Sequence, residues 1–186
     1  TEEICLPIIE KESKLLVREK SFNYGYSPER VNPGDNIHTI ENTIKVTSGS
    51  NKKAGKWIAK FYKSITKHDT YSAKDIKTAE AAKLIENIQR DVNIALINEF
   101  SIICSKLGLS TNDVLKAAST KWNFFNFKPG LVGGHCIGVD SNYLIYKSLK
   151  LGYKPNIISI SREVNELMPA WIFDRLVLEL GKKNTL

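Results

Sequence analysis

Apolar residues in the middle of this chain recur with the three- and four-residue spacing of an amphipathic helix. The longest such stretch runs from Thr78 to Leu107 and holds no proline or glycine. At about 1.5 Å per residue, a helix of this length extends for about 45 Å, which is more than one small domain covers. We therefore expect a helix over 78–107 whose apolar face is covered by a second copy of the protein, in a homodimer. Its apolar positions are Ala81, Leu84, Ile85, Ile88, Val92, Ala95, Leu96, Ile102, Ile103 and Leu107.

The residues before this helix alternate between helix and strand patterns. One helix is expected over 1–12, with Thr1 as its N-cap, and another over 52–64 with a row of apolar residues on one side. Apolar and aromatic residues predict strands over 22–26 and 43–47. These elements fit only part of an α/β domain, because two or three strands do not make a covered parallel sheet.

The residues after the long helix keep a helical pattern. Gly108 is expected to end the long helix, and Ser110 to cap a short helix after it. Asp140 is expected to cap a further helix, and a last helix is expected over 162–180 with Gly181 past its end. The second part of the chain is therefore predicted to be mainly α-helical.

The composition is that of an ordinary soluble globular protein, with 42% hydrophobic and 25% charged residues. No apolar run approaches the roughly 20 residues that a membrane-spanning helix needs. The first four residues, Thr1-Glu2-Glu3-Ile4, lack the basic and apolar pattern of a signal peptide. We therefore expect a cytoplasmic protein with no membrane partner.

The net charge of +7 raises the question of a nucleic-acid partner. The lysines are spread along the chain, however, with no run longer than Lys52-Lys53 or Lys182-Lys183, and no nucleic-acid motif accompanies them. A modest positive field suits a small anionic ligand, such as a phosphorylated one, equally well. We predict no nucleic-acid partner.

The three cysteines are Cys5, Cys104 and Cys136. An odd number without close pairing argues against a disulfide framework, and no cysteine–histidine cluster has the spacing of a zinc site. Cys5 and Cys104 lie in apolar helical contexts, which predicts small core residues. Neither a metal nor a disulfide is therefore expected.

A glycine-rich segment over 128–140 surrounds Cys136, with the letters KPGLVGGHCIGVD. Its four glycines cost backbone entropy and suit a loop that approaches a ligand closely. A cysteine near the start of the next helix is well placed to act as a nucleophile. The alternative is a glycine-rich turn with an inert buried cysteine. His135 is the neighbouring candidate base, although its place in the chain points it away from Cys136.

Lys83 and Asn87 are four residues apart on the long helix and therefore share one face. An ammonium and an amide at this spacing are able to stabilise an oxyanion or orient a water molecule. The alternative is a solvated lysine beside a surface amide. Asp140, four residues after Cys136, is either a plain N-cap or a carboxylate that also reaches water or the thiol. Of Asn98 and Glu99, further along the helix, one or both are expected to serve helix packing.

The chain resembles the UDP-glucose/UDP-N-acetylhexosamine dehydrogenases in four separated segments, in order along nearly its whole length. These segments are 27–35 (SPERVNPGD), 79–87 (AEAAKLIEN), 120–124 (TKWNF) and 133–140 (GGHCIGVD). The last resembles the UDP-N-acetylglucosamine or -galactosamine 6-dehydrogenases of bacterial surface-polysaccharide synthesis, such as that of capsule and O-antigen. UDP-glucose enzymes have Phe-Pro-Lys-Asp after the cysteine, so Val139 argues against UDP-glucose as substrate.

The resemblance implies an oxidation of the C6 alcohol of a UDP-N-acetylhexosamine to a uronate, with two NAD+ and a covalent intermediate on Cys136. It further implies that Lys83 and Asn87 stabilise oxyanions or position water, that Asp140 assists proton transfer, and that Glu29 lies beside the reacting centre and the cofactor. The remaining residues that it assigns to the substrate are Lys128, Pro129, Gly130, Leu131, Gly133 and Gly134. Arg162 and Asn165 are further candidates for contact with the substrate or with a partner subunit.

The resemblance also implies a domain order. Residues 1–68 correspond to the C-terminal part of a Rossmann-type NAD-binding α/β domain, and 69–186 to the central helical dimerisation domain with its long helix. The chain lacks the Gly-x-Gly-x-x-Gly segment that cradles a dinucleotide. We therefore expect a fragment that is inactive alone. Ser141 and Asn142 depart from the Pro-Tyr of close relatives, so the start of that helix is expected to differ locally.

Three alternatives remain open at this point. The chain fits a non-catalytic helical dimerisation module that keeps an ancestral loop. It also fits a dehydrogenase for UDP-glucose or UDP-N-acetylmannosamine. A related hydroxyacid dehydrogenase would use the lysine–asparagine pair without a cysteine and would form one NADH per product, where two are expected here.

Overall fold

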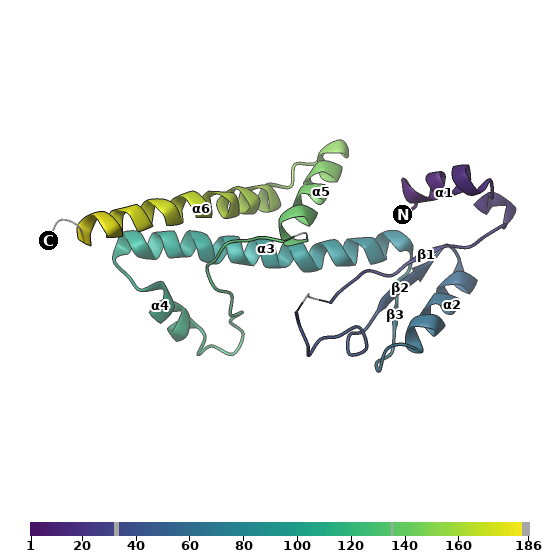
Figure 1. The fold of residues 1–186 in the computed structure, drawn as a ribbon, viewed down its shortest axis with the longest axis horizontal. Coiled ribbons are helices and arrows are strands. Elements are labelled where there is room, and N and C mark those ends of the chain that lie inside the picture. The colour runs from purple at the N-terminus through teal and green to yellow at the C-terminus, as the bar shows by residue number, and fades with distance from the viewer. Residues whose placement is uncertain (32–33, 135, 184–186) are drawn as a thin grey trace. The chain divides into compact units, whose positions relative to one another are not determined.

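The computed structural model describes residues 1–31, 34–134 and 136–183, which form two compact units (Figure 1). Unit 1 is Thr1–Lys83 and unit 2 is Leu84–Leu186. Unit 1 combines a small sheet with helices, whereas the described part of unit 2 is helical. The predicted fold class, a partial α/β region followed by a mainly helical one, is confirmed.

The sheet of unit 1 has three strands in the order β1-β2-β3. β2 (Val46–Gly49) is central, pairing antiparallel with β1 (Gly25–Tyr26) and parallel with β3 (Tyr71–Ser72). The first three residues of β2 are buried, as suits a central strand. Both predicted strands begin three residues too early, and the second also stops two residues short. β3 was missed because two exposed residues carry no strand pattern.

Helix α2 (Lys52–Lys63) covers the sheet and begins at Asn51, whose side chain accepts the Ala54 N–H at 2.9 Å. A Cβ added to Gly49 would lie only 2.3 Å from the Gly55 nitrogen, so this close packing of strand and helix requires glycine. The predicted apolar side of the helix is only partly buried, because Trp57 and Phe61 stack on each other in solvent.

The N-terminal helix differs from its prediction. α1 (Cys5–Ser13) begins after Ile4 without a side-chain cap, so the predicted cap at Thr1 is wrong. Cys5 is exposed, and its expected place in the core is also wrong. None of the residues of this helix is buried, so its apolar side chains do not contribute to the core of unit 1. A 3₁₀ turn, η1 (Val17–Glu19), follows it.

The predicted long helix is present as α3 (Ile76–Leu107), and Gly108 follows it at φ +69°, the left-handed backbone expected of a helix end. In the part of α3 that belongs to unit 2, one face is buried and mixes apolar with polar side chains. Its members are Asn87, Ile88, Asp91, Ala95, Ile97, Asn98, Ser101 and Cys104. α4 (Thr111–Ala118) comes next, capped as predicted by Ser110, which accepts the Asp113 N–H.

The last two helices correct three predictions. α5 (Ile137–Lys150) begins at Ile137, so Asp140 lies inside its first turn and does not cap the helix. α6 (Asn156–Lys183) begins just after Pro155, six residues before its predicted start, and the helix continues past Gly181. Pro169 lies within α6, where a proline removes one backbone hydrogen bond without ending the helix. α6 runs alongside α3, and side chains of the two helices are hydrogen-bonded (Figure 1).

Among the described residues, no helix combines the length and apolar content needed to cross a lipid bilayer.

Two isoleucines on α3 provide a matched test of this packing. Ile88 is 2% exposed and Ile85 is 58% exposed. At protein concentrations low enough to give a monomer, we expect Ile88→Ala to lower the free energy of unfolding by about 2–5 kcal/mol, since it leaves a cavity, and Ile85→Ala to lower it by less than about 1 kcal/mol. Urea unfolding followed by circular dichroism measures both. Equal losses at every protein concentration would contradict the assignment of the buried face.

Candidate functional site

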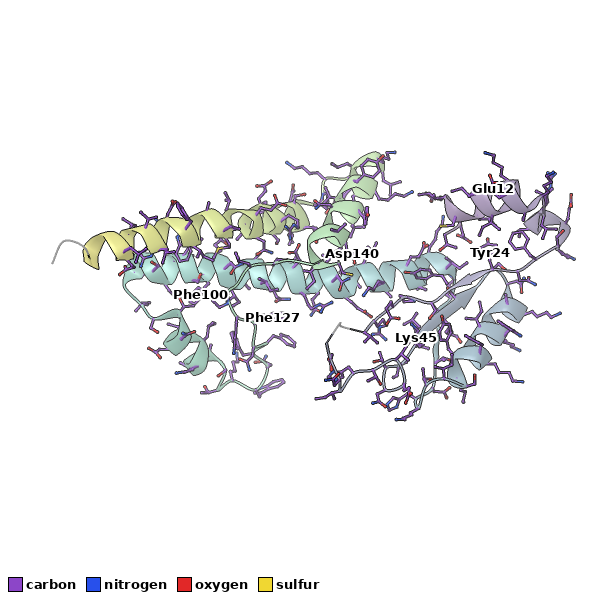
Figure 2. All side chains as sticks on the ribbon, in the orientation of Figure 1. Glu12, Tyr24, Lys45, Phe100, Phe127 and Asp140 are labelled. Carbon is purple, nitrogen blue, oxygen red and sulfur yellow. The ribbon has the colours of Figure 1, made fainter. Side chains whose placement is uncertain are left out.

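Asn87 and Asp140 are brought together in unit 2 from positions 53 residues apart. Asn87 Nδ2 donates to Asp140 Oδ2 at 2.5 Å, where α5 meets α3 (Figure 2). Asn87 is fully buried, so it is not the surface amide of the alternative interpretation. Its Oδ1 accepts from Arg90 Nη2, which sequence reasoning missed. The asparagine amide therefore fixes the Asp140 carboxylate on α3.

Cys136 is exposed and lies immediately before the first residue of α5. Its carbonyl accepts the N–H groups of Val139 at 3.1 Å and Asp140 at 2.9 Å. The cysteine thus occupies the N-terminal end of a helix, with the carboxylate-bearing residue one turn further on. The position leaves the thiol accessible to a ligand. His135, the neighbouring candidate base, lies outside the described residues.

The glycine loop over 128–134 is fastened to α3 at one glycine. Gly130 donates its N–H to Asn98 Oδ1 at 2.8 Å and accepts from Asn98 Nδ2 at 2.9 Å. Beyond this point the loop is open, with Leu131, Gly133 and Gly134 exposed. Gly134 has φ +88°, a conformation that favours glycine. The loop therefore has one fixed end and a free surface that faces solvent before Cys136.

Glu29 lies in unit 1, and its carboxylate is held by the backbone. Oε1 accepts the N–H groups of Arg30 and Val31, both at 2.8 Å. Partial burial alone would raise the pKa of Glu29, but these two hydrogen bonds and the positive charges of Lys45 and Lys83 outweigh it and lower that pKa. Glu29 is therefore a carboxylate at neutral pH.

Lys45 is a residue of this region that sequence reasoning missed. Its side chain is 3% exposed, with Nζ donating to the Pro28 carbonyl at 2.7 Å and lying 3.7 Å from Glu29 Oε2 (Figure 2). The ammonium also lies 5.2 Å from the ring centroid of Tyr62. Burial lowers the pKa of Lys45, and the Glu29 charge opposes that shift. The signal in the sequence was a single lysine between Ile44 and Val46.

Arg162, a candidate for contact with the substrate or a partner subunit, makes ion pairs within unit 2. Its side chain is 10% exposed and binds Asp91 Oδ1 at 2.8 Å and Glu166 Oε1 at 3.2 Å. Asn165 is also buried and donates to Asp91. The structure therefore gives both residues contacts within the helical unit. Asp91, a buried carboxylate on the apolar side of a helix, was not singled out from the sequence.

Ser141 lies at the fifth position of α5 and is fully buried. Its Oγ donates to Asp91 Oδ2 at 2.7 Å. The departure noted at this position therefore adds a contact between α5 and α3. No group of three or more His, Cys, Asp or Glu residues within the described ranges is arranged to hold a metal ion.

Unit 2 is thus built on one long helix, with a cysteine at the start of a shorter helix and an asparagine–aspartate pair beside it. Residues 77–167 match the central domain of the UDP-glucose/GDP-mannose dehydrogenase family, and this part of the chain belongs to that family.

Relatives of known name are similar over almost the entire chain. Protein CapL of Staphylococcus aureus is 52% identical over 98% of this chain, and the UDP-N-acetyl-D-glucosamine 6-dehydrogenase of Pseudomonas aeruginosa is 51% identical over 98%. The chain spans 43% of the length of each of these two relatives.

Solved structures agree with this membership. The UDP-D-ManNAc dehydrogenase from Pyrococcus horikoshii matches 96% of this chain and 42% of its own, with a TM-score of 0.83 and 32% identity. The NDP-N-acetyl-D-galactosaminuronic acid dehydrogenase from Methanosarcina mazei matches 98% of this chain and 41% of its own, with a TM-score of 0.84 and 28% identity.

The contact between Lys45 and Glu29 leads to a prediction about charge. Lys45→Gln removes a positive charge that favours the carboxylate, so we expect the pKa of Glu29 to rise. Stability that ionised Glu29 contributes is present above its unfolded-state pKa and is lost as pH falls through the lower folded pKa, so the variant loses it at higher pH. NMR titration of the Glu29 carboxyl carbon measures the shift.

Lys53→Gln is the matched control for this titration, because Lys53 is an exposed lysine at the start of α2. The control is expected to leave the Glu29 titration in place. Identical Glu29 titrations in the Lys45→Gln variant and the unsubstituted protein would contradict the assigned contact.

Proposed function

We propose that this chain is part of an NAD-dependent UDP-N-acetylhexosamine 6-dehydrogenase. The observation that carries the proposal is the accessible Cys136 at the start of α5, one turn from an Asp140 carboxylate that buried Asn87 holds in place. The name of the relative from P. aeruginosa, at 51% identity, supports UDP-N-acetylglucosamine as substrate. Relatives named for UDP-N-acetyl-D-mannosamine are 36% identical, which makes that sugar the second candidate.

The proposed reaction oxidises the sugar C6 from alcohol to carboxylate. Bound NAD+ would serve as the hydride acceptor in both oxidation steps. Cys136 would hold the C6 carbon covalently, first as the thiohemiacetal formed from the aldehyde and then, after the second oxidation, as a thioester. Water then displaces the thiol and yields the uronate, so each product accompanies two NADH.

The other proposed site residues handle charge and protons. Lys83 and Asn87 are placed by α3 to stabilise the oxyanions formed at C6 and to orient water. Asp140 takes up or returns a proton during these steps, and Asn87 holds its carboxylate in one orientation. Glu29, ionised and fixed by two backbone N–H groups, is proposed to act beside the reacting centre. Lys128, Pro129, Gly130, Leu131, Gly133 and Gly134 form the proposed contact surface for the nucleotide sugar.

NAD is the expected hydride acceptor, and the chain fits only part of its site. The sequence contains no Gly-x-Gly-x-x-Gly segment for the dinucleotide phosphates. Glu29 is the residue proposed to lie near the cofactor. We assign residues 1–68 to the C-terminal part of an NAD-binding domain and 69–186 to the central helical domain. By this proposal, activity requires a longer, cytoplasmic protein that carries the phosphate cradle, and the chain alone is inactive.

The test compares two exposed cysteines in the full-length enzyme. Cys136→Ala removes the nucleophile and is expected to lower turnover with UDP-N-acetylglucosamine by more than about a hundredfold, in the range for the loss of a catalytic group. Cys5→Ala is the control and is expected to retain turnover. The unsubstituted enzyme should form two NADH per uronate. One NADH per product, or full activity of Cys136→Ala, would refute the mechanism.

The second part of the proposal is a homodimer formed through the long helix. In unit 2, α3 carries four well-exposed apolar side chains. Successive members lie eleven, seven and four residues apart, and these spacings place all four on one face of the helix. They are Ile85, Leu96, Ile103 and Leu107, exposed by 58%, 60%, 45% and 67%. An apolar stripe of this length is unfavourable in water and fits a second copy of the chain. Dimerisation alone would also serve the alternative, non-catalytic module.

A charge in the middle of this stripe tests the dimer. Leu96→Glu is expected to give a monomer at concentrations at which the unsubstituted protein is dimeric, because two buried carboxylates would face the interface without partners. Sedimentation velocity measures the mass. Glu99→Lys, at an exposed position of the same helix, is the control and is expected to remain dimeric. A dimeric Leu96→Glu protein would exclude this face as the interface.

A further inference from the structure

Five buried polar residues of unit 2, Asp91, Asn98, Ser141, Arg162 and Asn165, form one connected network. Asp91 and Asn98 are 0% exposed, and Asn165 is 4% exposed. Asn165 Nδ2 donates to Asp91 Oδ1 at 2.7 Å and to the Asp91 carbonyl at 3.0 Å. Asn98 Nδ2 in turn donates to Asn165 Oδ1 at 2.9 Å. Hydrogen bonds therefore link two positions of α3 through one residue of α6.

One end of this network holds the glycine loop. The Asn98 amide pairs with both the N–H and the carbonyl of Gly130, as a neighbouring strand would. Both hydrogen bonds would break if the loop moved along α3 by one residue. Gly130 lies six residues before Cys136, so the network fixes the chain on the N-terminal side of the thiol.

The other end of the network holds the start of α5. Ser141 Oγ donates to Asp91 Oδ2 at 2.7 Å, and Arg162 Nη1 donates to Asp91 Oδ1 at 2.8 Å. The Asp91 carboxylate therefore has donors from α5 and α6 together, and Arg162 offsets its charge. Ser141 follows Asp140 directly and lies five residues after Cys136. Both chain segments that flank the thiol are thus tied to α3.

Burying this network costs desolvation free energy, so stability alone does not explain why these residues are polar. Removing a carboxylate, a guanidinium and two amides from water costs several kcal/mol per ion, and apolar side chains of similar volume often fill such a space equally well or better. A hydrogen-bonded network differs from an apolar core in admitting one register of its partners, since any shift leaves buried groups unpaired.

We propose that Asp91, Asn98, Asn165 and Ser141 are positioning residues for the Cys136 thiol. Together they fix the glycine loop and the start of α5 against α3, and through these two attachments they set where the thiol stands. The inference rests on the proposed function for the role of Cys136, and it adds residues that act through the backbone and without touching the substrate.

The first experiment removes the weakest link in the full-length enzyme. Ser141→Ala deletes one hydrogen bond and is expected to lower kcat about tenfold with little change in KM, because a small misplacement of a reacting group is enough for such a loss. Ser141→Thr keeps the hydroxyl and is expected to restore most of kcat. Ser148→Ala, in the same helix, is the control that should retain activity.

The second experiment measures the connection itself and needs no turnover. Hydrogen exchange of the Gly130 N–H, which Asn98 accepts, is expected to be faster in Ser141→Ala, although residue 141 belongs to α5. The rate at which iodoacetamide alkylates Cys136 should change in the same variant. A Ser141→Ala protein with unchanged Gly130 exchange, Cys136 alkylation and kcat would overturn the proposal.

A double-substitution cycle separates positioning from general destabilisation. Asn98→Ala and Ser141→Ala act on one network, so their combined effect on log kcat is expected to be smaller than the sum of the single effects. Strictly additive losses would contradict a shared role. If the enzyme fails to reduce NAD+ with any UDP-sugar, the proposed function falls, whereas the exchange and alkylation results still decide the positioning role.

Discussion

The helical unit depends on the buried carboxylate of Asp91. A charge with no exposure to water must be fully hydrogen-bonded, and here its donors come from two other helices: Ser141 on α5, and Arg162 and Asn165 on α6. Meeting this requirement brings α5 and α6 to one position on α3. The geometry of the candidate site follows from it, because Asp140 is the neighbour of Ser141 and lies within reach of Asn87.

The same constraint separates rigid from accessible parts of the site. Asn87, Asn98 and Asp91 are buried, whereas Cys136 and most of the glycine loop are exposed. A nucleophile needs access to its substrate, and its supporting groups need fixed positions. Unit 1 shows a similar arrangement on a smaller scale, where buried Lys45 and two backbone N–H groups hold an exposed Glu29.

Much of the fold was predictable because local pattern and tertiary role agree. The apolar period of α3, its glycine end and the Ser110 cap are short-range signals, and each is present in the structure. Predictions went wrong where a long-range contact decided the outcome. β2 extends to Gly49 because Gly49 pairs with Gly25 of β1.

The sequence alone determined the types of chemical group available: a thiol beside glycines, a lysine and an asparagine one turn apart, and a carboxylate one turn after the thiol. It also determined which stretches are helical, since helix formation depends on neighbours three or four residues away. Only the tertiary structure decided which polar residues are buried and paired. Asp91 and Lys45 resemble surface residues in the sequence, and partners up to 74 positions away give them their roles. Such hydrogen bonds depend on how helices and strands pack, and they leave no periodic signal along the chain.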